Sequence, residues 1–267
     1  MWGRYFRRKH FLDRLLFISR KLPAGLLRQR LEISFRGLPS GHSVGCRAAR
    51  LNSLAKQMSR CEDYLEVGVQ YGFTLANVEV KNKTGVDPNL MFNPKLARGV
   101  MLHRTTSDEF FSELAEEIQY DLVFLDGLHT FEQTARDFLN ALKHLRPGGV
   151  IVIDDVVPDT EAKALPDREE SLYRQLLETG QTSGEWFGDV WKLPVAVKEV
   201  FADLLVVETF GHGVCGQSVI RFGKEPFRIS EIAERALTTF GSLEYADYFR
   251  EGENPRLPGY QVEGDPD

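Results

Sequence analysis

Between residues 46 and 153, short apolar runs of strand character alternate with stretches of helical periodicity, and this alternation restricts the fold more than any other feature. Such alternation is typical of βαβ units with a parallel sheet. The run Val150-Ile151-Val152-Ile153 is continuous and β-branched, which indicates a strand buried on both faces. Strands are expected at about 63–69, 83–87, 99–103, 121–126 and 150–153.

Helices are expected between these runs, at 46–59, from Phe73, around Phe110 and from Phe131. The helix from Phe131 has the clearest pattern, because its apolar residues form one stripe. Thr130 and Gln133 match a capping box at its start. The residues Pro147-Gly148-Gly149 are predicted to stop it.

After residue 153 the pattern changes. A charged helical stretch at 160–179 and a loop at 180–194 precede two strand-like runs, Leu204–Val207 and Val214–Phe222. The link between these runs is short and contains glycine, so the two strands must be antiparallel. The hairpin and the absence of G-x-G-x-x-G argue against an NAD-dependent oxidoreductase.

Charge and composition suggest three parts: a basic helical arm (residues 1–45), a central α/β domain (46–223) and a C-terminal helix with an acidic tail (224–267). Residues 1–50 contain 12 of the 33 Lys and Arg residues but only two acidic ones, so they carry +10 and the remainder −16. From Glu251 the Pro/Gly-rich tail is expected to be loose.

Three widely spaced cysteines, Cys46, Cys61 and Cys215, predict free thiols in a reducing compartment. Neither a secretory apolar region nor a membrane span is recognisable. A cytoplasmic location is therefore expected. The Phe/Leu faces of the basic arm also allow weak contact with a membrane surface, or contact with a second copy of the chain.

The first strand is followed by a glycine turn that suits a ligand. Gly68 and Gly72 allow close backbone approach, Glu66 favours a positively charged cofactor, and Asp87 ends the next strand where ribose hydroxyls would bind. The alternatives are glycines needed only for packing and an Asp-Pro turn at Asp87. Beyond the third strand, Asp108 can contact an adenine, and Ser107 can be merely a helix cap.

Acidic residues also follow the fourth and fifth strands: Asp126 with His129 nearby, and Asp154-Asp155. Neighbouring parallel strands bring their carboxyl ends together, so these groups should crowd one edge. Carboxylate oxygens suit Mg²⁺ or another hard divalent cation, and an imidazole there is a candidate base. The structural alternative is that Asp155 or Asp159 caps the next helix and His129 is structural.

Five motifs in order resemble the class I S-adenosylmethionine-dependent methyltransferases, over about residues 46–223. They are similar to the branch with metal-dependent O-methyltransferases of small molecules and sugars. The motifs are E-V-G-V-Q-Y-G, G-V-D-P, F-L-D-G-L-H-T-F-E-Q, L-R-P-G-G-V-I-V-I-D-D and the late hairpin. The resemblance implies a doubly wound, seven-stranded, mostly parallel sheet with an antiparallel last strand.

The resemblance also implies roles. S-adenosylmethionine would contact the residues Glu66, Gly68, Gly72, Asp87, Ser107, Asp108 and Asp126. A divalent metal would lie at Asp126, Asp154 and Asp155. Relatives often read D-G-D where this chain has Leu128, which shifts the base role to His129. The stretch 188–192 would border the acceptor pocket, with Trp191 as a core residue in the alternative interpretation.

We therefore expect metal-assisted O-methylation of a hydroxyl on a small molecule or glycan, with Asp126 and His129 as catalytic residues. The alternatives are a metal-independent methyltransferase and a non-catalytic cofactor-binding or scaffold protein. No specific nucleic-acid partner is expected, because the body is acidic and no base-flipping N-P-P-Y motif is present near the fourth strand.

Overall fold

The computed structural model describes residues 42–181, 184–201, 205–211, 216–222 and 231–262. The basic arm up to residue 41 lies outside this set, as do Cys215 and the last five residues. Cys61 is a free thiol, as expected. Among the described helices, none is both long and apolar enough to cross a membrane.

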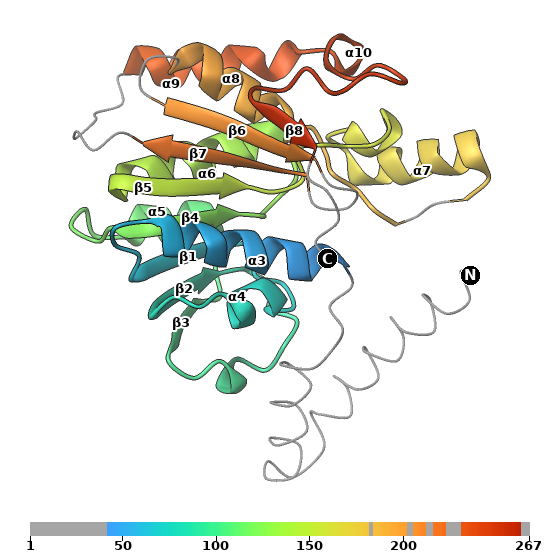
Figure 1. The fold of residues 1–267 in the computed structure, drawn as a ribbon. Coiled ribbons are helices and arrows are strands. Elements are labelled where there is room, and N and C mark those ends of the chain that lie inside the picture. The colour runs from blue at the N-terminus through green and yellow to red at the C-terminus, as the bar shows by residue number, and fades with distance from the viewer. Residues whose placement is uncertain (1–41, 182–183, 202–204, 212–215, 223–230, 263–267) are drawn as a thin grey trace.

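An eight-stranded sheet forms the centre of the molecule, in the order β3-β2-β1-β4-β5-β7-β6-β8 (Figure 1). The strands are β1 Asp63–Val67, β2 Asn82–Val86, β3 Val100–His103, β4 Tyr120–Leu125, β5 Leu145–Ile153, β6 Leu205–Gly211, β7 Gln217–Phe222 and β8 Tyr260–Val262. The first five pair in parallel, and β7 is antiparallel to both β5 and β6. The predicted doubly wound, mostly parallel sheet is confirmed.

The helices lie on both faces of the sheet. They are α3 His42–Gln57, α4 Phe73–Asn77, α5 Ser107–Glu113, α6 Phe131–Lys143, α7 Arg168–Thr179, α8 Lys192–Val200, α9 Glu231–Thr238 and α10 Tyr245–Tyr248, with 3-10 turns η1 Pro94–Leu96, η2 Ala162–Ala164 and η3 Thr239–Ser242. Because α3 begins at His42, it starts four residues earlier than expected. The division of the chain into three parts stays a prediction.

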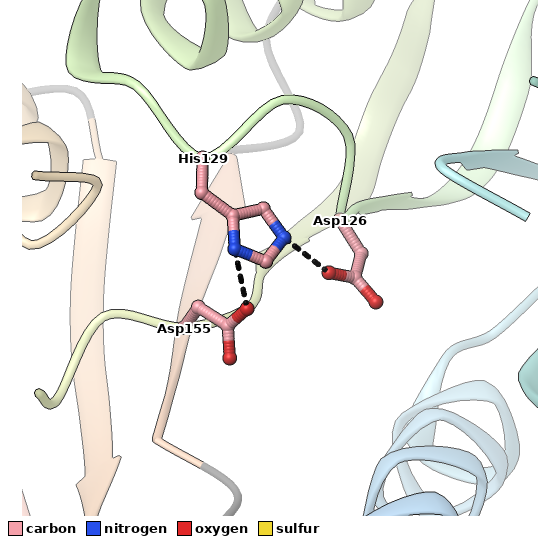
Figure 2. A group of neighbouring side chains, drawn as sticks. All are labelled: Asp126, His129 and Asp155. Atoms are coloured by element: carbon pink, nitrogen blue, oxygen red, sulfur yellow. Dashed lines mark ion pairs between the residues drawn. The ribbon is translucent and has the colours of Figure 1, made fainter. Parts of the chain in front are cut away.

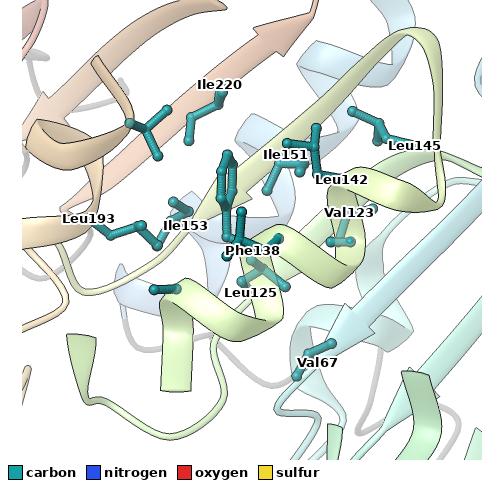
Figure 3. Packing of buried hydrophobic residues seen from close by; sticks show 14 of the residues in the cluster. Val67, Val123, Leu125, Phe138, Leu142, Leu145, Ile151, Ile153, Leu193 and Ile220 are labelled. Atoms are coloured by element: carbon teal, nitrogen blue, oxygen red, sulfur yellow. The ribbon is translucent and has the colours of Figure 1, made fainter. Parts of the chain in front are cut away.

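Two apolar layers separate the sheet from its helices. In β5, Ile151 and Ile153 pack toward α6 and α8, as Figure 3 shows, whereas Val150 and Val152 face the side of α3 and α4. All four side chains are almost fully buried. The alternation of one strand between two cores explains its continuous β-branched sequence.

The sequence prediction was wrong about the tail. Strand β8 pairs in parallel with β6, which makes eight strands where seven were predicted. Leu257 is buried beside Trp191 and Val195, and Gly259 accepts a backbone hydrogen bond from Thr209 at 3.2 Å. A three-residue strand within a Pro/Gly-rich segment is too short to produce a recognisable alternation.

The start of β5 also differs from the prediction. Helix α6 ends at Lys143, and Pro147-Gly148-Gly149 lies inside β5 instead of stopping the helix directly. Tyr120 pairs with Leu145, but the pairing then shifts to Leu122 with Val150. The intervening residues therefore bulge out of the ladder, as prolines and glycines in strands commonly do.

Candidate active site

The loop after β1 has a backbone conformation that favours glycine. Gly68, Gln70 and Gly72 all have positive φ, at 91°, 43° and 73°. Gly72 caps α4 without a side-chain bond. A β-carbon at Gly68 would lie 1.8 Å from the backbone oxygen of Asp126, so only glycine fits there. The glycine turn thus lies directly against the end of β4.

Two carboxylates support this turn. Glu66 is 1% exposed and accepts a hydrogen bond from the Tyr64 hydroxyl at 2.6 Å. Burial raises the pKa of Glu66 to about 8, so the group is mostly protonated at neutral pH. Asp87 accepts backbone hydrogen bonds from Gln70 at 2.8 Å and Asn89 at 2.6 Å. The hydrogen bond from Asn89 is the contact expected of an Asp-Pro turn, the alternative interpretation of Asp87. The contact of Asp87 with a ribose stays a prediction.

The start of α5 is not capped by Ser107, a role that the sequence allowed as an alternative for that residue. Thr106 caps the helix and forms a capping box with Glu109, so Ser107 is not the cap. Ser107 and Asp108 instead accept hydrogen bonds from the Gln133 side chain, at 3.3 and 3.1 Å. The side chain of Asp108 is 51% exposed. Its contact with an adenine stays a prediction.

At the ends of β4 and β5, Asp126, His129 and Asp155 converge (Figure 2). His129 Nε2 lies 3.4 Å from Asp126 Oδ1, and His129 Nδ1 lies 3.2 Å from Asp155 Oδ2. His129 Nδ1 also lies 2.8 Å from the Trp186 carbonyl oxygen, and the two rings stack with centroids 5.2 Å apart. The imidazole is thus held between two carboxylates and an indole.

A residue that the sequence interpretation missed, Arg47 of α3, lies against the same carboxylates. Its Nε pairs closely with Asp154 Oδ2, Nη2 lies 3.5 Å from Asp155 Oδ1, and Nη1 lies 4.0 Å from Asp126 Oδ2. The other oxygen of Asp154 accepts a hydrogen bond from Gln217 at 2.9 Å. Two buried carboxylates and the half-buried Asp126 require positive charge nearby, and Arg47 supplies it.

Charge and burial shift the pKa values of this cluster. Burial opposes protonation of His129, but Asp155 and Asp126 together raise its pKa to about 10. Burial raises the pKa of Asp154 to about 8 and that of Asp155 to about 6, although Arg47 and His129 respectively act against these shifts. In this arrangement the imidazole is charged at neutral pH. It can act as a base only after another cation neutralises the two carboxylates.

Residues 184–191, which precede α8, lie against His129 and the start of α6. A β-carbon at Gly188 would lie 1.6 Å from the His129 carbonyl oxygen. Asp189 accepts the backbone N–H of Phe131 at 2.6 Å, which satisfies the start of α6. Trp191 is 1% exposed and packs on aromatic rings near α10, so it is a core residue.

The donor set fits a hard cation. One atom each from Asp126, His129 and Asp155 lie within 4.8 Å of one another. Asp154, the third predicted ligand, points to Arg47 and Gln217. The alternative that Asp155 or Asp159 caps the next helix is wrong, because Asp167 caps α7 and Glu161 precedes η2.

A family model described as a methyltransferase domain matches residues 41–156, which span α3 to the end of β5 and include this cluster. Over these 116 of the 267 residues, the chain is similar to the methyltransferase domain family. The resemblance drawn from the motifs is therefore confirmed at the level of the family. No curated protein matches the sequence.

Solved structures are similar to this chain over more of its length than the family model covers. An O-methyltransferase from Bacillus cereus in complex with S-adenosylhomocysteine is 15% identical, with 79% of this chain and 96% of that chain covered and a TM-score of 0.46. The O-methyltransferase TomG from Streptomyces achromogenes is 15% identical, with 78% of this chain and 95% of that chain covered and a TM-score of 0.44. The methyltransferase MycE from the mycinamycin biosynthetic pathway, in complex with Mg and S-adenosylhomocysteine, is 16% identical. The match covers 68% of this chain and 54% of that chain, with a TM-score of 0.44.

A cavity of about 990 Å³ is lined by residues from Val157 onward, and no residue of the carboxylate cluster lines it. Its walls are residues 157–161 after β5, Gly211 and Gly216 of the hairpin strands, and parts of the segment 245–262. Tyr245 and Phe249 line it and stack on each other with centroids 4.6 Å apart. Strands β5, β6 and β8 all end at this edge, so the cavity and the cluster share one side of the sheet.

Proposed function

We propose that this chain transfers a methyl group from S-adenosylmethionine to a hydroxyl of a small molecule or glycan. The observation that carries the proposal is the contact of the glycine turn at Gly68 with Asp126. It places the predicted cofactor loop directly beside the carboxylates that would activate an acceptor. Because methyl transfer requires the donor and the acceptor oxygen in line, adjacency of the two sites is the main requirement.

For the cofactor, we propose contacts with the residues that the sequence predicted: Glu66, Gly68, Gly72, Asp87, Ser107, Asp108 and Asp126. Gly68 and Gly72 shape the turn that would carry the methionine part, Asp87 directly follows β2 where ribose would bind, and Asp108 is exposed for an adenine. These residues come from the ends of four neighbouring strands, β3, β2, β1 and β4, which is the usual position of a nucleotide in an open parallel sheet.

For the metal, Asp126 and Asp155 would supply oxygens, with Asp154 as the third predicted ligand. A divalent cation bound there would stabilise negative charge on the acceptor oxygen. His129 lies between the two carboxylates, where it would take the hydroxyl proton as general base. The acceptor oxygen then forms a bond to the methyl carbon, and the carbon–sulfur bond breaks with its electron pair on sulfur.

For the acceptor, we propose the cavity lined by residues 157–161 and the C-terminal segment. It carries Asp159, Glu161, Glu251 and Glu253 against one arginine, and Asp159 is paired with Lys163 at 2.8 Å. Acidic groups beside the stacked rings of Tyr245 and Phe249 suit a neutral or cationic hydroxylated compound better than an anionic one.

Calorimetric titration of the purified chain with S-adenosylmethionine is the first test. Binding in the micromolar range is the expected result, and an absence of heat at millimolar ligand would remove the proposal. The second test adds methyl-labelled cofactor and a metabolite extract and follows label transfer. Binding without transfer to any physiological compound would favour the scaffold alternative.

A metal-independent methyltransferase is the second candidate. Arg47 favours it, because its guanidinium already supplies positive charge to Asp126, Asp154 and Asp155. EDTA treatment and Asp154→Ala separate the two candidates. Loss of label transfer in both experiments supports metal assistance, and unchanged transfer in both supports the metal-independent reaction.

A further inference from the structure

The carboxylates of Asp126 and Asp155 each divide their two oxygens between two protein cations. In Asp126, Oδ1 faces His129 and Oδ2 faces Arg47. In Asp155, Oδ2 faces His129 and Oδ1 faces Arg47. Both carboxylates are thus bridged by an imidazole on one side and a guanidinium on the other, and Arg47 also pairs with Asp154.

A divalent ion that binds Asp126 and Asp155 would therefore share oxygens that already face two positively charged groups. His129 has further contacts with the Trp186 carbonyl oxygen and the Trp186 ring. Arg47 is on the second turn of α3 and reaches the cluster through a long side chain, of which 19% is exposed. A guanidinium stays charged at any physiological pH and repels a nearby cation.

We propose that the Arg47 guanidinium and a divalent metal ion compete for the oxygens of Asp126 and Asp155. The inference rests on the metal site of the proposed function. Arg47 stabilises the clustered carboxylates in the metal-free protein and weakens metal binding. When a metal ion enters, the guanidinium leaves these two carboxylates. In the metal-free protein, Asp154 is therefore a partner of Arg47 and not a metal ligand.

The experiment titrates Mn²⁺ into the full-length protein without cofactor and follows free Mn²⁺ by electron paramagnetic resonance. The variants are Arg47→Met and, as a matched control, Lys56→Met, which removes one positive charge from an exposed position of the same helix. Arg47→Met is expected to bind Mn²⁺ about tenfold more tightly than the wild type, or better. Lys56→Met should stay within about twofold, because solvent screens its distant charge.

Thermal unfolding gives an independent measurement. Without metal, Arg47→Met should melt below the wild type, and saturating Mn²⁺ should raise its midpoint more than that of the wild type. Equal or weaker Mn²⁺ affinity in Arg47→Met, or no binding in either protein, overturns the proposal. If Arg47→Met does not fold, Arg47→Lys decides, with an expected affinity above that of the wild type because an ammonium makes fewer contacts.

The outcome does not depend on catalysis. Calorimetry with S-adenosylmethionine on the same preparations tests the proposed function separately. A protein that binds Mn²⁺ as expected but not the cofactor would retain the competition and lose the methyltransferase proposal. If the protein binds the cofactor and Arg47→Met does not change the Mn²⁺ affinity, the methyltransferase proposal stands and the competition is refuted.

Discussion

Gly68 packs on the backbone of Asp126 so closely that a β-carbon at position 68 would lie 1.8 Å from the Asp126 carbonyl oxygen. The amide of Asp126 also donates to the carbonyl of Val67 at 2.8 Å. Backbone contacts therefore hold the ends of β1 and β4 together, in addition to the packing of Val67 and Leu125 in one core. This contact fixes the distance between the glycine turn and the carboxylate cluster.

Gly68→Ala should consequently damage both stability and cofactor binding. The alanine would clash with backbone atoms and adopt a φ of 91°, so we expect the free energy of unfolding to fall by about 3 kcal/mol or more. Gly99→Ala is the matched control, because Gly99 has a φ of 75° and nothing within 4 Å of the added carbon. It should cost only about 1–2 kcal/mol. Equal losses in chemical denaturation would contradict the role of the contact.

Much of the sheet was predictable, because both signals involved are local. The apolar run at 150–153 and the short glycine link after β6 predict a buried parallel strand and a hairpin from a few residues each. Strand β8 was not predictable, since Tyr260–Val262 has no pattern of its own and pairs with β6 next to the buried Leu257. Its stability derives from tertiary packing.

The same distinction holds for the site. Asp126, Asp155 and His129 were predictable as neighbours, because parallel topology brings their strand ends together. Arg47 and Gln217 were not, because they reach Asp154 from α3 and β7, which lie 107 residues before and 63 residues after it in the chain. A carboxylate cluster indicates that a cation is needed, but only the fold shows which arginine supplies it.

Glu66 should make stability depend on pH. Its pKa is raised from 4.5 to about 8 by burial, so the folded protein holds a proton that the unfolded chain releases. The contribution is fully favourable below pH 4.5 and is lost as pH rises to about 8. We expect the free energy of unfolding to fall over this window, by at most about 1.4 kcal/mol per pH unit from this group.

The variant Glu66→Gln isolates this effect, because the amide has a similar shape and does not ionise. Its side-chain oxygen can still accept the hydrogen bond from Tyr64. In urea denaturation series between pH 5 and 8, the variant should gain stability relative to the wild type as pH rises. Parallel curves for the two proteins would show that the Glu66 proton is not retained on folding.

The acceptor cavity can be tested by filling it. Glu161 lines the cavity and has an exposed side chain that caps no helix, so Glu161→Trp should fold normally. We expect cofactor affinity within about twofold of the wild type, and label transfer into a metabolite extract reduced by about tenfold or more. Unchanged transfer would place the acceptor elsewhere, and loss of cofactor binding would show that the substitution disturbs the turn after β1.

The variant His129→Gln distinguishes a base from a ligand. His129 faces both Asp126 and Asp155, so its nitrogens are positioned for either role. As a general base it should contribute about 10²- to 10⁴-fold to turnover. We therefore expect label transfer to fall by that amount and Mn²⁺ affinity not to fall, because removal of a positively charged imidazole leaves the carboxylates more attractive to a cation. A weaker Mn²⁺ affinity in paramagnetic resonance titrations would instead identify His129 as a metal ligand, and another group would then have to accept the hydroxyl proton.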